Sequence, residues 1–267
     1  MTPRVDLYDG SYDRFAAEAQ EAVRAATYGE DLGQSSWMVA DELRGFARLL
    51  ELDGSSSLLE VGSGSGGPAL LLAAETGCRV TGIDVNEFGV RNGERLARER
   101  GLDTRVEFRI VDASIALPFA DASFDAVFSN DAMCHVPNRA GALREWHRVL
   151  RSGGRMLFTD ALVVTGLVSH EEIATRSSIG YYCYSPVGEN ERLIAEAGFE
   201  LERVEDLTSA AASVSRRWHD ARAGRRSALV ALEGEENFEG LQRFLWCVHT
   251  VSDERRLSRF MYLARRP

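Results

Sequence analysis

Three glycines at alternating positions, Gly62, Gly64 and Gly66, follow a short apolar stretch in the first quarter of the chain. Glycines allow a chain to turn tightly and let its backbone approach a ligand closely. Asp84 stands where the next apolar stretch ends, and a carboxylate at that position can accept hydrogen bonds from ribose hydroxyls. The spacing therefore predicts a nucleoside site. With Gly67 the run also satisfies the NAD(P) fingerprint, so it leaves the nucleoside open.

Charged and polar residues around this run favour a cationic, adenosine-bearing ligand over NAD(P). Glu60 precedes the first glycine by two positions, where its carboxylate repels a diphosphate and attracts a cation. Asp112 and Ala113 follow the third apolar stretch, where a carboxylate can accept a hydrogen bond from an adenine amino group. A polar segment from Asn130 to His135 follows the fourth, and open α/β sheets bind ligands at this edge.

The apolar stretches alternate with helical patterns, which indicates strands connected by helices. We expect strands at 57–62, 79–84, 106–111, 124–130 and 154–160. We expect helices at 67–76, 86–100 and 138–151, the last closed by Gly153 and Gly154. Such alternation implies a parallel sheet with right-handed crossovers.

The two flanks of this region differ from it. Before it, the sequence predicts helices at 13–26 and 39–52. After it, we expect a helix at 185–197, a strand from Gly198, helices over 210–250 and a last strand at 258–264. The chain has no internal repeat.

Composition excludes several classes of protein. The 267 residues carry a net charge of −10, which argues against nucleic acid because phosphate binding needs a basic face. No apolar run approaches the roughly 18 residues that span a membrane, and the N-terminus has no apolar signal core. The four cysteines form no Cys-x-x-Cys pair, so we expect no metal. We expect a cytoplasmic protein with a small-molecule partner, and the sequence does not indicate its oligomeric state.

Residues 57–160 resemble the core of the class I S-adenosylmethionine-dependent methyltransferases. Four motifs in register carry the likeness: the glycine run with Glu60, the ribose-binding acid Asp84, the adenine position Asp112-Ala113 and the glycine turn in Leu150–Arg155. The resemblance implies a doubly wound, Rossmann-like α/β fold with a seven-stranded mixed sheet and a helical lid. Its last strand would be antiparallel, which distinguishes this fold from that of dehydrogenases.

The resemblance also implies how the chain is divided and where S-adenosylmethionine binds. Residues 1–52 would form a helical lid segment, 53–160 the cofactor-binding core, and 161–267 the rest of the sheet with acceptor-pocket helices inserted at about 209–252. The implied cofactor contacts are Glu60, Gly62, Gly64, Gly66, Asp84, Val85, Asp112, Ala113 and Asn130, with Tyr28 and Ser36 from a segment that closes over the cofactor.

The flanks resemble a narrower group, the methyltransferases that act on amines such as glycine derivatives and phosphoethanolamine. Asp131-Ala-Met-Cys-His135 matches their Asp-Ala-x-x-His, whose histidine works with a tyrosine from the N-terminal helix. Tyr8 and Tyr12 are candidates for that tyrosine. The arginine that grips phosphate in the phosphoethanolamine enzymes falls at Gly180, which disfavours that substrate. The implied acceptor contacts are Asp131, Tyr12, Tyr182 and Trp37.

We therefore expect methyl transfer from S-adenosylmethionine to a small molecule, first of all to an amine nitrogen, with His135 as the base. Oxygen or carbon in a natural-product scaffold is the alternative acceptor. His135 could instead pack beneath the lid. An NAD(P)-dependent oxidoreductase and a binding module without turnover are the alternatives of a different class. Arg216 and Arg217 suggest either a guanidinium fork for a carboxylate or a solvated helix face.

Overall fold

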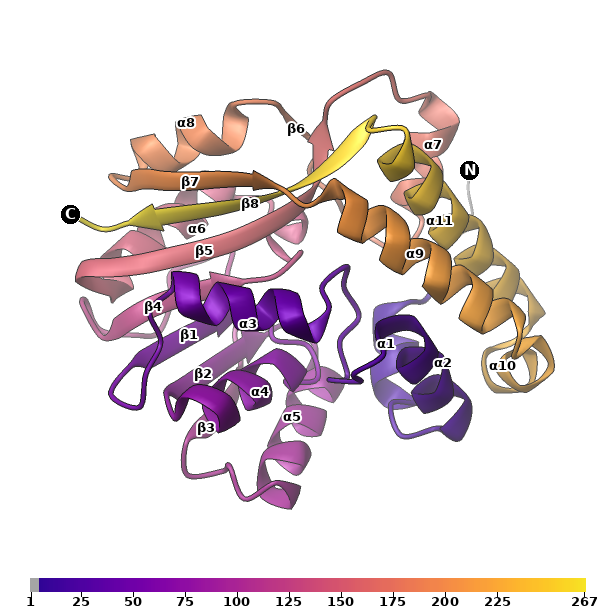
Figure 1. Cartoon of the computed structure of the whole chain (residues 1–267), viewed down its shortest axis with the longest axis horizontal. Coiled ribbons are helices and arrows are strands. Elements are labelled where there is room, and N and C mark those ends of the chain that lie inside the picture. The colour runs from indigo at the N-terminus through magenta and orange to yellow at the C-terminus, as the bar shows by residue number, and fades with distance from the viewer. Residues whose placement is uncertain (1–4) are drawn as a thin grey trace.

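A mixed sheet forms the centre of the structure, a computed structural model that describes residues 5–267 (Figure 1). Its strands follow the order β3-β2-β1-β4-β5-β8-β7. Their bounds are β1 Ser57–Val61, β2 Arg79–Asp84, β3 Val106–Ile110, β4 Phe124–Ser129, β5 Leu150–Val164, β7 Glu200–Asp206 and β8 Leu257–Arg265. Neighbours among β1 to β5 are parallel, whereas β8 is antiparallel to both β5 and β7.

The strand order reverses at β1, which has β2 on one side and β4 on the other. In doubly wound sheets such a reversal opens a crevice beyond the carboxyl ends of the strands. The glycine run follows β1, and the polar segment that contains His135 follows β4. The expected doubly wound fold and antiparallel last strand are confirmed. An eighth strand, the two-residue β6 (Ser185–Pro186), pairs with the end of β5 and adds to the seven expected.

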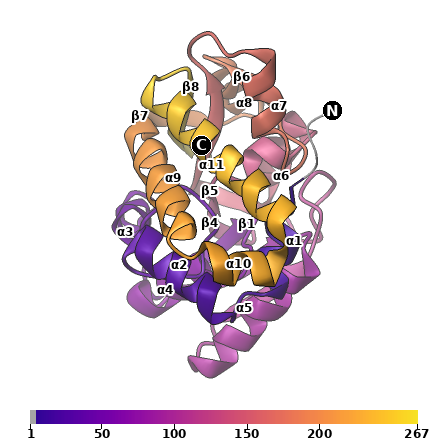
Figure 2. The same ribbon diagram turned by 90° about the vertical axis from the view of Figure 1, so that its right-hand side faces the viewer.

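Helices from both ends of the chain gather beyond the carboxyl ends of the strands (Figure 2). Val23, Trp218 and Phe244, from α2, α9 and α11, share one buried apolar cluster, so these helices pack as one unit. No helix among residues 5–267 is long and apolar enough to cross a membrane. The bounds of the helices in this region are α1 Tyr8–Asp13, α2 Glu18–Tyr28, α7 His170–Arg176, α9 Thr208–Ala223, α10 Arg226–Glu233 and α11 Glu235–Asp253.

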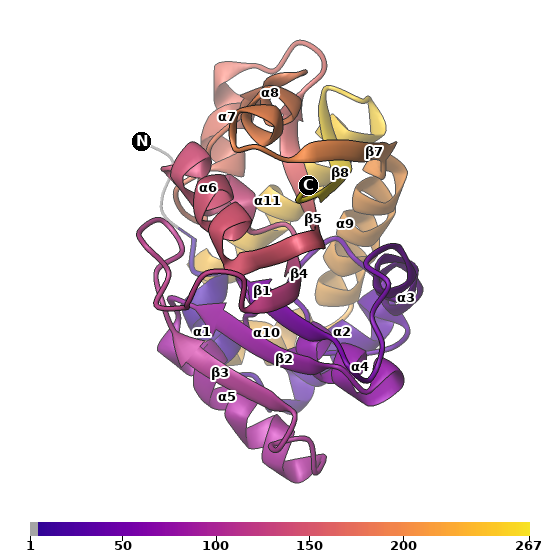
Figure 3. The same ribbon diagram turned by 90° about the vertical axis from the view of Figure 1, so that its left-hand side faces the viewer.

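Five further helices cover the two faces of the sheet (Figure 3). On one face, α3, α4 and α5 bury apolar residues against Phe128 and Leu157. On the other face, α6 and α8 enclose a cluster around Trp146, which is fully buried. The bounds are α3 Ala40–Leu49, α4 Gly67–Thr76, α5 Glu87–Glu99, α6 Arg139–Val149 and α8 Glu189–Glu196. These two layers fix the carboxyl ends of the strands in place.

The fifth strand differs most from its expected bounds. The preceding helix ends at Val149 because Leu150 already pairs with Phe124 of β4. Gly153 and Gly154 therefore lie inside β5, and the expectation that they close the helix was wrong. At its other end β5 continues past 160 because the apolar residues that follow pair with β6 and β8.

Two helix starts also differ from expectation. The helix expected at 185–197 begins at Glu189, because Ser185 and Pro186 join the sheet as β6. The helix expected at 13–26 is α2, which begins at Glu18. A separate short helix, α1, precedes it and was not expected. The first four residues of the expected lid segment lie outside the described residues.

Candidate active site

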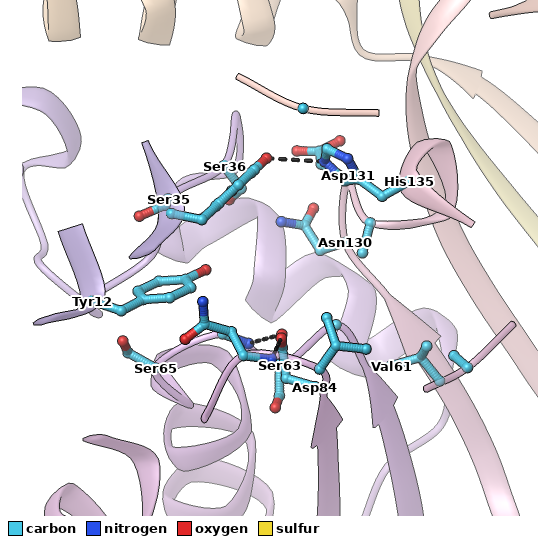
Figure 4. A pocket seen from close by; sticks show the side chains of 18 of the residues that line it. Tyr12, Ser35, Ser36, Val61, Ser63, Ser65, Asp84, Asn130, Asp131 and His135 are labelled. Atoms are coloured by element: carbon cyan, nitrogen blue, oxygen red, sulfur yellow. Dashed lines mark hydrogen bonds between the residues drawn. The ribbon is translucent and has the colours of Figure 1, made fainter. Parts of the chain in front are cut away.

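A cavity of about 670 Å³ lies where β1 to β4 end, beneath α1. Its walls come from the turns after these strands, from α1, from residues 33–36 and from residues 179–181. Figure 4 shows its two ends, which we name by their residues. The glycine-turn end contains Tyr12, Ser63, Ser65 and Asp84, and the histidine end contains Asn130, Asp131 and His135.

Asp84 connects the glycine turn to the start of α5 through its two carboxylate oxygens. The N–H of Gly64 donates to Oδ2 of Asp84 at 2.8 Å, and the N–H of Asn86 donates to Oδ1 at 2.8 Å. Gly64 has a φ of +52°, and a Cβ there would lie 2.7 Å from the hydroxyl oxygen of Tyr12. Glycine is therefore required at this position for two reasons, the backbone conformation and the close approach of Tyr12 from α1.

Glu60 is a buried carboxylate in the wall of the cavity. Burial first, and then the neighbouring charge of Asp84, raise the pKa of Glu60 to about 8. Among the described residues, Oε2 of Glu60 and the hydroxyl of Ser63 are buried without a hydrogen-bond partner. A carboxyl group with one unpaired oxygen, in the same wall as an unpaired hydroxyl, suits a ligand that carries a positive charge and hydrogen-bond donors. These residues therefore fit S-adenosylmethionine.

The residues expected beside ribose and adenine form one continuous part of the wall. Val85, Asp112 and Ala113 all line the cavity near Asp84. Val85 is 67% exposed, which is unusual for a valine and leaves its side chain free to contact a flat ligand. The carboxylate of Asp112 accepts a hydrogen bond from the N–H of Ser114 and is otherwise exposed.

Asp131 is fixed by protein groups on both of its carboxylate oxygens. Oδ1 accepts from Nε of the buried Arg259 at 2.8 Å, and Oδ2 accepts from the N–H of Trp37 at 3.0 Å. Asn130 also accepts from Arg259, at 2.9 Å. Asp131 has a φ of +53°, an uncommon conformation for a residue with a side chain. This network supports the turn after β4, so that Asp131 positions the cavity wall.

His135 forms a hydrogen-bonded pair with Tyr8 from α1. Nδ1 of His135 lies 2.9 Å from the carbonyl oxygen of Tyr181, which can only accept, so Nδ1 carries the proton. Nε2 is therefore the acceptor for the hydroxyl of Tyr8, also at 2.9 Å. Burial, and less strongly the Arg176 cation, lower the pKa of His135. The imidazole is thus neutral near pH 7, with its lone pair directed at Tyr8.

Apolar side chains surround this pair. They come from the chain start, from the segment after His135 and from the loop after α7, and they are Val5, Leu7, Val136, Pro137 and Ile179. Tyr182 places its ring 4.5 Å from the ring of His135, centre to centre. His135 therefore lies in surroundings from which much water is excluded.

Four of the residues expected to contact cofactor or substrate do not line this cavity. Tyr28 donates its hydroxyl to the carbonyl of Ser36, so it supports the wall from behind. Gly66 packs against Phe108 on the far side of the turn. Trp37 and Tyr182 line a separate, smaller cavity behind the histidine end.

Tyr12 differs from its expected position, and Arg216 and Arg217 agree with one of the two alternatives that the sequence left open. Tyr12 lies over Gly64, at the glycine-turn end and not at the histidine end. Arg216 pairs with Asp220, and Arg217 donates to the carbonyl of Thr27. Neither guanidinium is directed into the cavity, so the solvated-face reading suits them better.

Sequence reasoning missed most of the apolar wall at the histidine end. Val5, Leu7 and Ile179 carry no motif, and they meet only because α1 folds back across the sheet. Gln34 and Ser35 were missed as well, although they adjoin the expected Ser36. Only Gln34 and Ser35 could have been found from the sequence, because they belong to the same polar loop as Ser36.

Comparison with known proteins agrees with this geometry. Residues 59–158 match the family model described as a methyltransferase domain. The chain is 32% identical over 206 residues to 27-O-demethylrifamycin SV methyltransferase of Amycolatopsis mediterranei, with 76% of this chain and 70% of that protein aligned. It is 30% identical over 200 residues to sarcosine/dimethylglycine N-methyltransferase of Halorhodospira halochloris, with 70% and 67% aligned.

Solved structures show the same fold. The [4+2]-cyclase SpnF superposes with a TM-score of 0.75 at 25% identity, over 99% of both chains. Phosphoethanolamine N-methyltransferase 2 of Haemonchus contortus, solved with S-adenosyl-L-methionine, gives a TM-score of 0.80 at 21% identity, over 98% of this chain and 60% of that one. The protein thus belongs to the S-adenosylmethionine-dependent methyltransferases that act on small molecules.

Proposed function

We propose that this enzyme methylates a hydroxyl oxygen on a largely apolar small molecule, with His135 as the base and Tyr8 as its partner. The observation that carries the proposal is the directed lone pair on Nε2 of His135 at the apolar end of the cavity. A hydroxyl group is a weak nucleophile until it loses its proton, so it needs such a base.

In the proposed reaction Tyr8, which donates to Nε2 of His135, passes its proton to that nitrogen and takes up the proton of the acceptor hydroxyl, which lies against it. The oxygen keeps its electron pair and forms the new bond to carbon. S-adenosylmethionine, when bound, supplies a methyl group on a sulfonium, and transfer breaks the sulfur–carbon bond to leave S-adenosylhomocysteine. The carbonyl of Tyr181 holds the imidazole in the required tautomer. Tyr8 orients the ring, and α1 excludes water.

The cofactor would lie at the glycine-turn end. We assign the ribose hydroxyls to Asp84, the adenine to Val85, Asp112 and Ala113, and the positively charged part of the cofactor to Glu60. The unpaired Oε2 of Glu60 supports this placement.

The amine acceptor favoured by the sequence has less support. A charged amine would be recognised by a carboxylate, but the carboxylates of the cavity wall near the histidine end already have partners. Asp131 accepts from Arg259 and Trp37, and Asp6 accepts from the N–H of Gly10. The names of the two relatives differ on the acceptor atom. One is a 27-O-demethylrifamycin SV methyltransferase, and the other is a sarcosine/dimethylglycine N-methyltransferase. We therefore keep the amine as the second candidate.

The test is a screen of paired alcohols, phenols and amines for release of S-adenosylhomocysteine. Turnover of amines alone would overturn the proposed oxygen acceptor. With an accepted phenol, His135→Ala is expected to lower kcat by about 10²–10⁴ because the base is lost. Tyr8→Phe keeps the base and is expected to lower kcat less. Undiminished turnover by His135→Ala would exclude His135 as the base, whatever the acceptor.

A thermal-shift comparison separates the alternatives of a different class. S-adenosylhomocysteine is expected to raise the Tm of the enzyme, and NADH is not. Stabilisation by NADH alone would favour an oxidoreductase. Stabilisation by S-adenosylhomocysteine without turnover of any acceptor would favour a binding module.

A further inference from the structure

Arg176 is a buried cation without a counter-ion. It is the last residue of α7, and only 2% of its surface is exposed. Its Nε and Nη1 have no hydrogen-bond partner within residues 5–267, and no carboxylate in that range lies within ion-pair distance. A charge taken out of water in this way is costly unless another charge compensates it.

Four other arginines are buried among residues 5–267, and each is compensated. Arg24 pairs with Asp31 at 3.0 Å. Arg139 pairs with Asp160 at 2.7 Å. Arg222 pairs with Glu233. Arg259 pairs with Asp131 at 2.8 Å and with Glu42 at 2.6 Å. These are the contacts expected where an arginine serves the fold alone. The missing partner of Arg176 therefore suggests that a ligand supplies the negative charge.

Aromatic rings hold the guanidinium of Arg176 in place. Its central carbon lies 5.1 Å from the ring centre of Phe244, 5.2 Å from that of Tyr182 and 5.9 Å from that of Trp37. Ring faces attract a cation electrostatically. They do not satisfy Nε and Nη1, whose N–H groups remain available to an oxygen acceptor.

A small cavity of about 20 Å³ adjoins Arg176. This is room for about one water-sized atom. Leu7, Tyr8 and Ile179 line both this cavity and the large one, so a single layer of side chains separates them. Asp131 also lines the small cavity, but both of its oxygens are already bonded to protein donors.

The small cavity lies directly behind the pair formed by His135 and Tyr8. The ring of Tyr182 contacts the guanidinium of Arg176 on one side of this arrangement and the ring of His135 on the other. An anionic group beside Arg176 would therefore lie one side chain away from the base. Because Leu7, Tyr8 and Ile179 line both cavities and separate them, a molecule from the large cavity would reach Arg176 only where these side chains move apart, and it would then present a hydroxyl to His135 and an anion to Arg176.

We propose that Arg176 and the small cavity form a binding site for an anionic oxygen, supplied by a carboxylate group of the acceptor. Arginine suits this role because its N–H groups donate charge-assisted hydrogen bonds to an anionic oxygen, and the small cavity has room for one such atom. The acceptor would then be a hydroxy acid on an apolar scaffold. This identity rests on the proposed O-methylation, whereas the anion site itself does not. A free carboxylate ion, which has the same chemistry, is the other source of an anionic oxygen beside Arg176.

The first arm of the test measures anion binding without catalysis. Sodium formate is titrated in a thermal-shift assay against the wild type, Arg176→Met and the control Arg192→Met, which removes an exposed arginine on α8. Formate is expected to stabilise the wild type and Arg192→Met, and not Arg176→Met. Without formate, Arg176→Met is expected to match or exceed the Tm of the wild type, because an unpaired buried charge is gone.

The second arm uses catalysis to identify the source of the anion. The KM values of 3- and 4-hydroxybenzoate are compared with those of their methyl esters. An acceptor carboxylate predicts a KM at least about tenfold lower for the acids, competition by formate, and loss of this preference in Arg176→Met. Formate binding with equal KM values for acids and esters identifies the free ion as the source.

The proposal is overturned if neither formate stabilisation nor the preference for acids depends on Arg176. If no acceptor is methylated, the proposed function fails and the formate arm alone decides the anion site. If Arg176→Met does not fold, Arg176→Lys replaces it, because lysine keeps the charge and loses the planar fork. Formate affinity left unchanged by Arg176→Lys would then overturn the proposal.

Discussion

Glu60 shows how a single binding residue acts on stability. Its pKa rises from about 4.5 to about 8 on folding, chiefly through burial, so the folded state holds the proton more tightly than the unfolded state does. Below the lower value both states are protonated and Glu60 costs nothing. Between about pH 4.5 and 8 the unfolded state gives up this proton and the folded state keeps it, so the free energy of unfolding of the cofactor-free protein falls with pH, by on the order of 5 kcal/mol in all once the pH is above 8. Glu60→Gln is therefore expected to raise the Tm at about pH 9 and to leave it unchanged near pH 4.

The same substitution is expected to weaken the binding of S-adenosylmethionine. Ionised Glu60 attracts a sulfonium, whereas the neutral thioether of S-adenosylhomocysteine gains less. In the wild type, the affinity for S-adenosylmethionine relative to S-adenosylhomocysteine should fall as the pH drops below 8, and in Glu60→Gln this ratio should be flat. Calorimetric titration of both ligands across this range tests the idea. A wild-type ratio that does not change with pH would contradict the role of Glu60.

Residues of the glycine-turn end could be predicted because their partners are close in sequence. Gly64 and Asp84 are 20 positions apart and belong to one strand–turn–helix–strand unit. The pair of Tyr8 and His135 spans 127 positions, and only the resemblance to known enzymes suggested a tyrosine partner. Arg176 carries no sequence signal at all, because its importance lies in the carboxylate that it lacks.

At the scale of elements, α1 is the part that closes the site. Asn92 of α5 donates to the carbonyl of Tyr12 at 2.8 Å, and Asn86 donates to Asp9 at 2.6 Å. Asn92→Ala removes the first bond, which is worth about 1 kcal/mol, so S-adenosylhomocysteine should dissociate roughly fivefold faster with little change in Tm. Stopped-flow displacement measures this rate. Arg91→Ala, on the exposed side of the same helix, is the control and should not alter it.

The elements differ in how far their sequences determine them. β1 and β2 agree with expectation almost to the residue, because their apolar runs are short and end at glycine or a carboxylate. α1 was missed because its N-cap residue, Leu7, makes no side-chain cap hydrogen bond and its six residues have no apolar periodicity. It is held by contacts to α5 that only the folded chain provides.

At the scale of the whole molecule, Arg259 connects the last strand to the site and to the N-terminal segment. From β8 it pairs with Asp131 beside the cavity and with Glu42 of α3, and it is fully buried. Arg259→Met would leave two buried carboxylates unpaired, with an expected loss of about 3–5 kcal/mol of unfolding free energy. Adding Asp131→Asn and Glu42→Gln removes those charges and should recover much of it. Urea unfolding of the single, double and triple variants measures the coupling, and additive losses would show that the three residues do not act as one network.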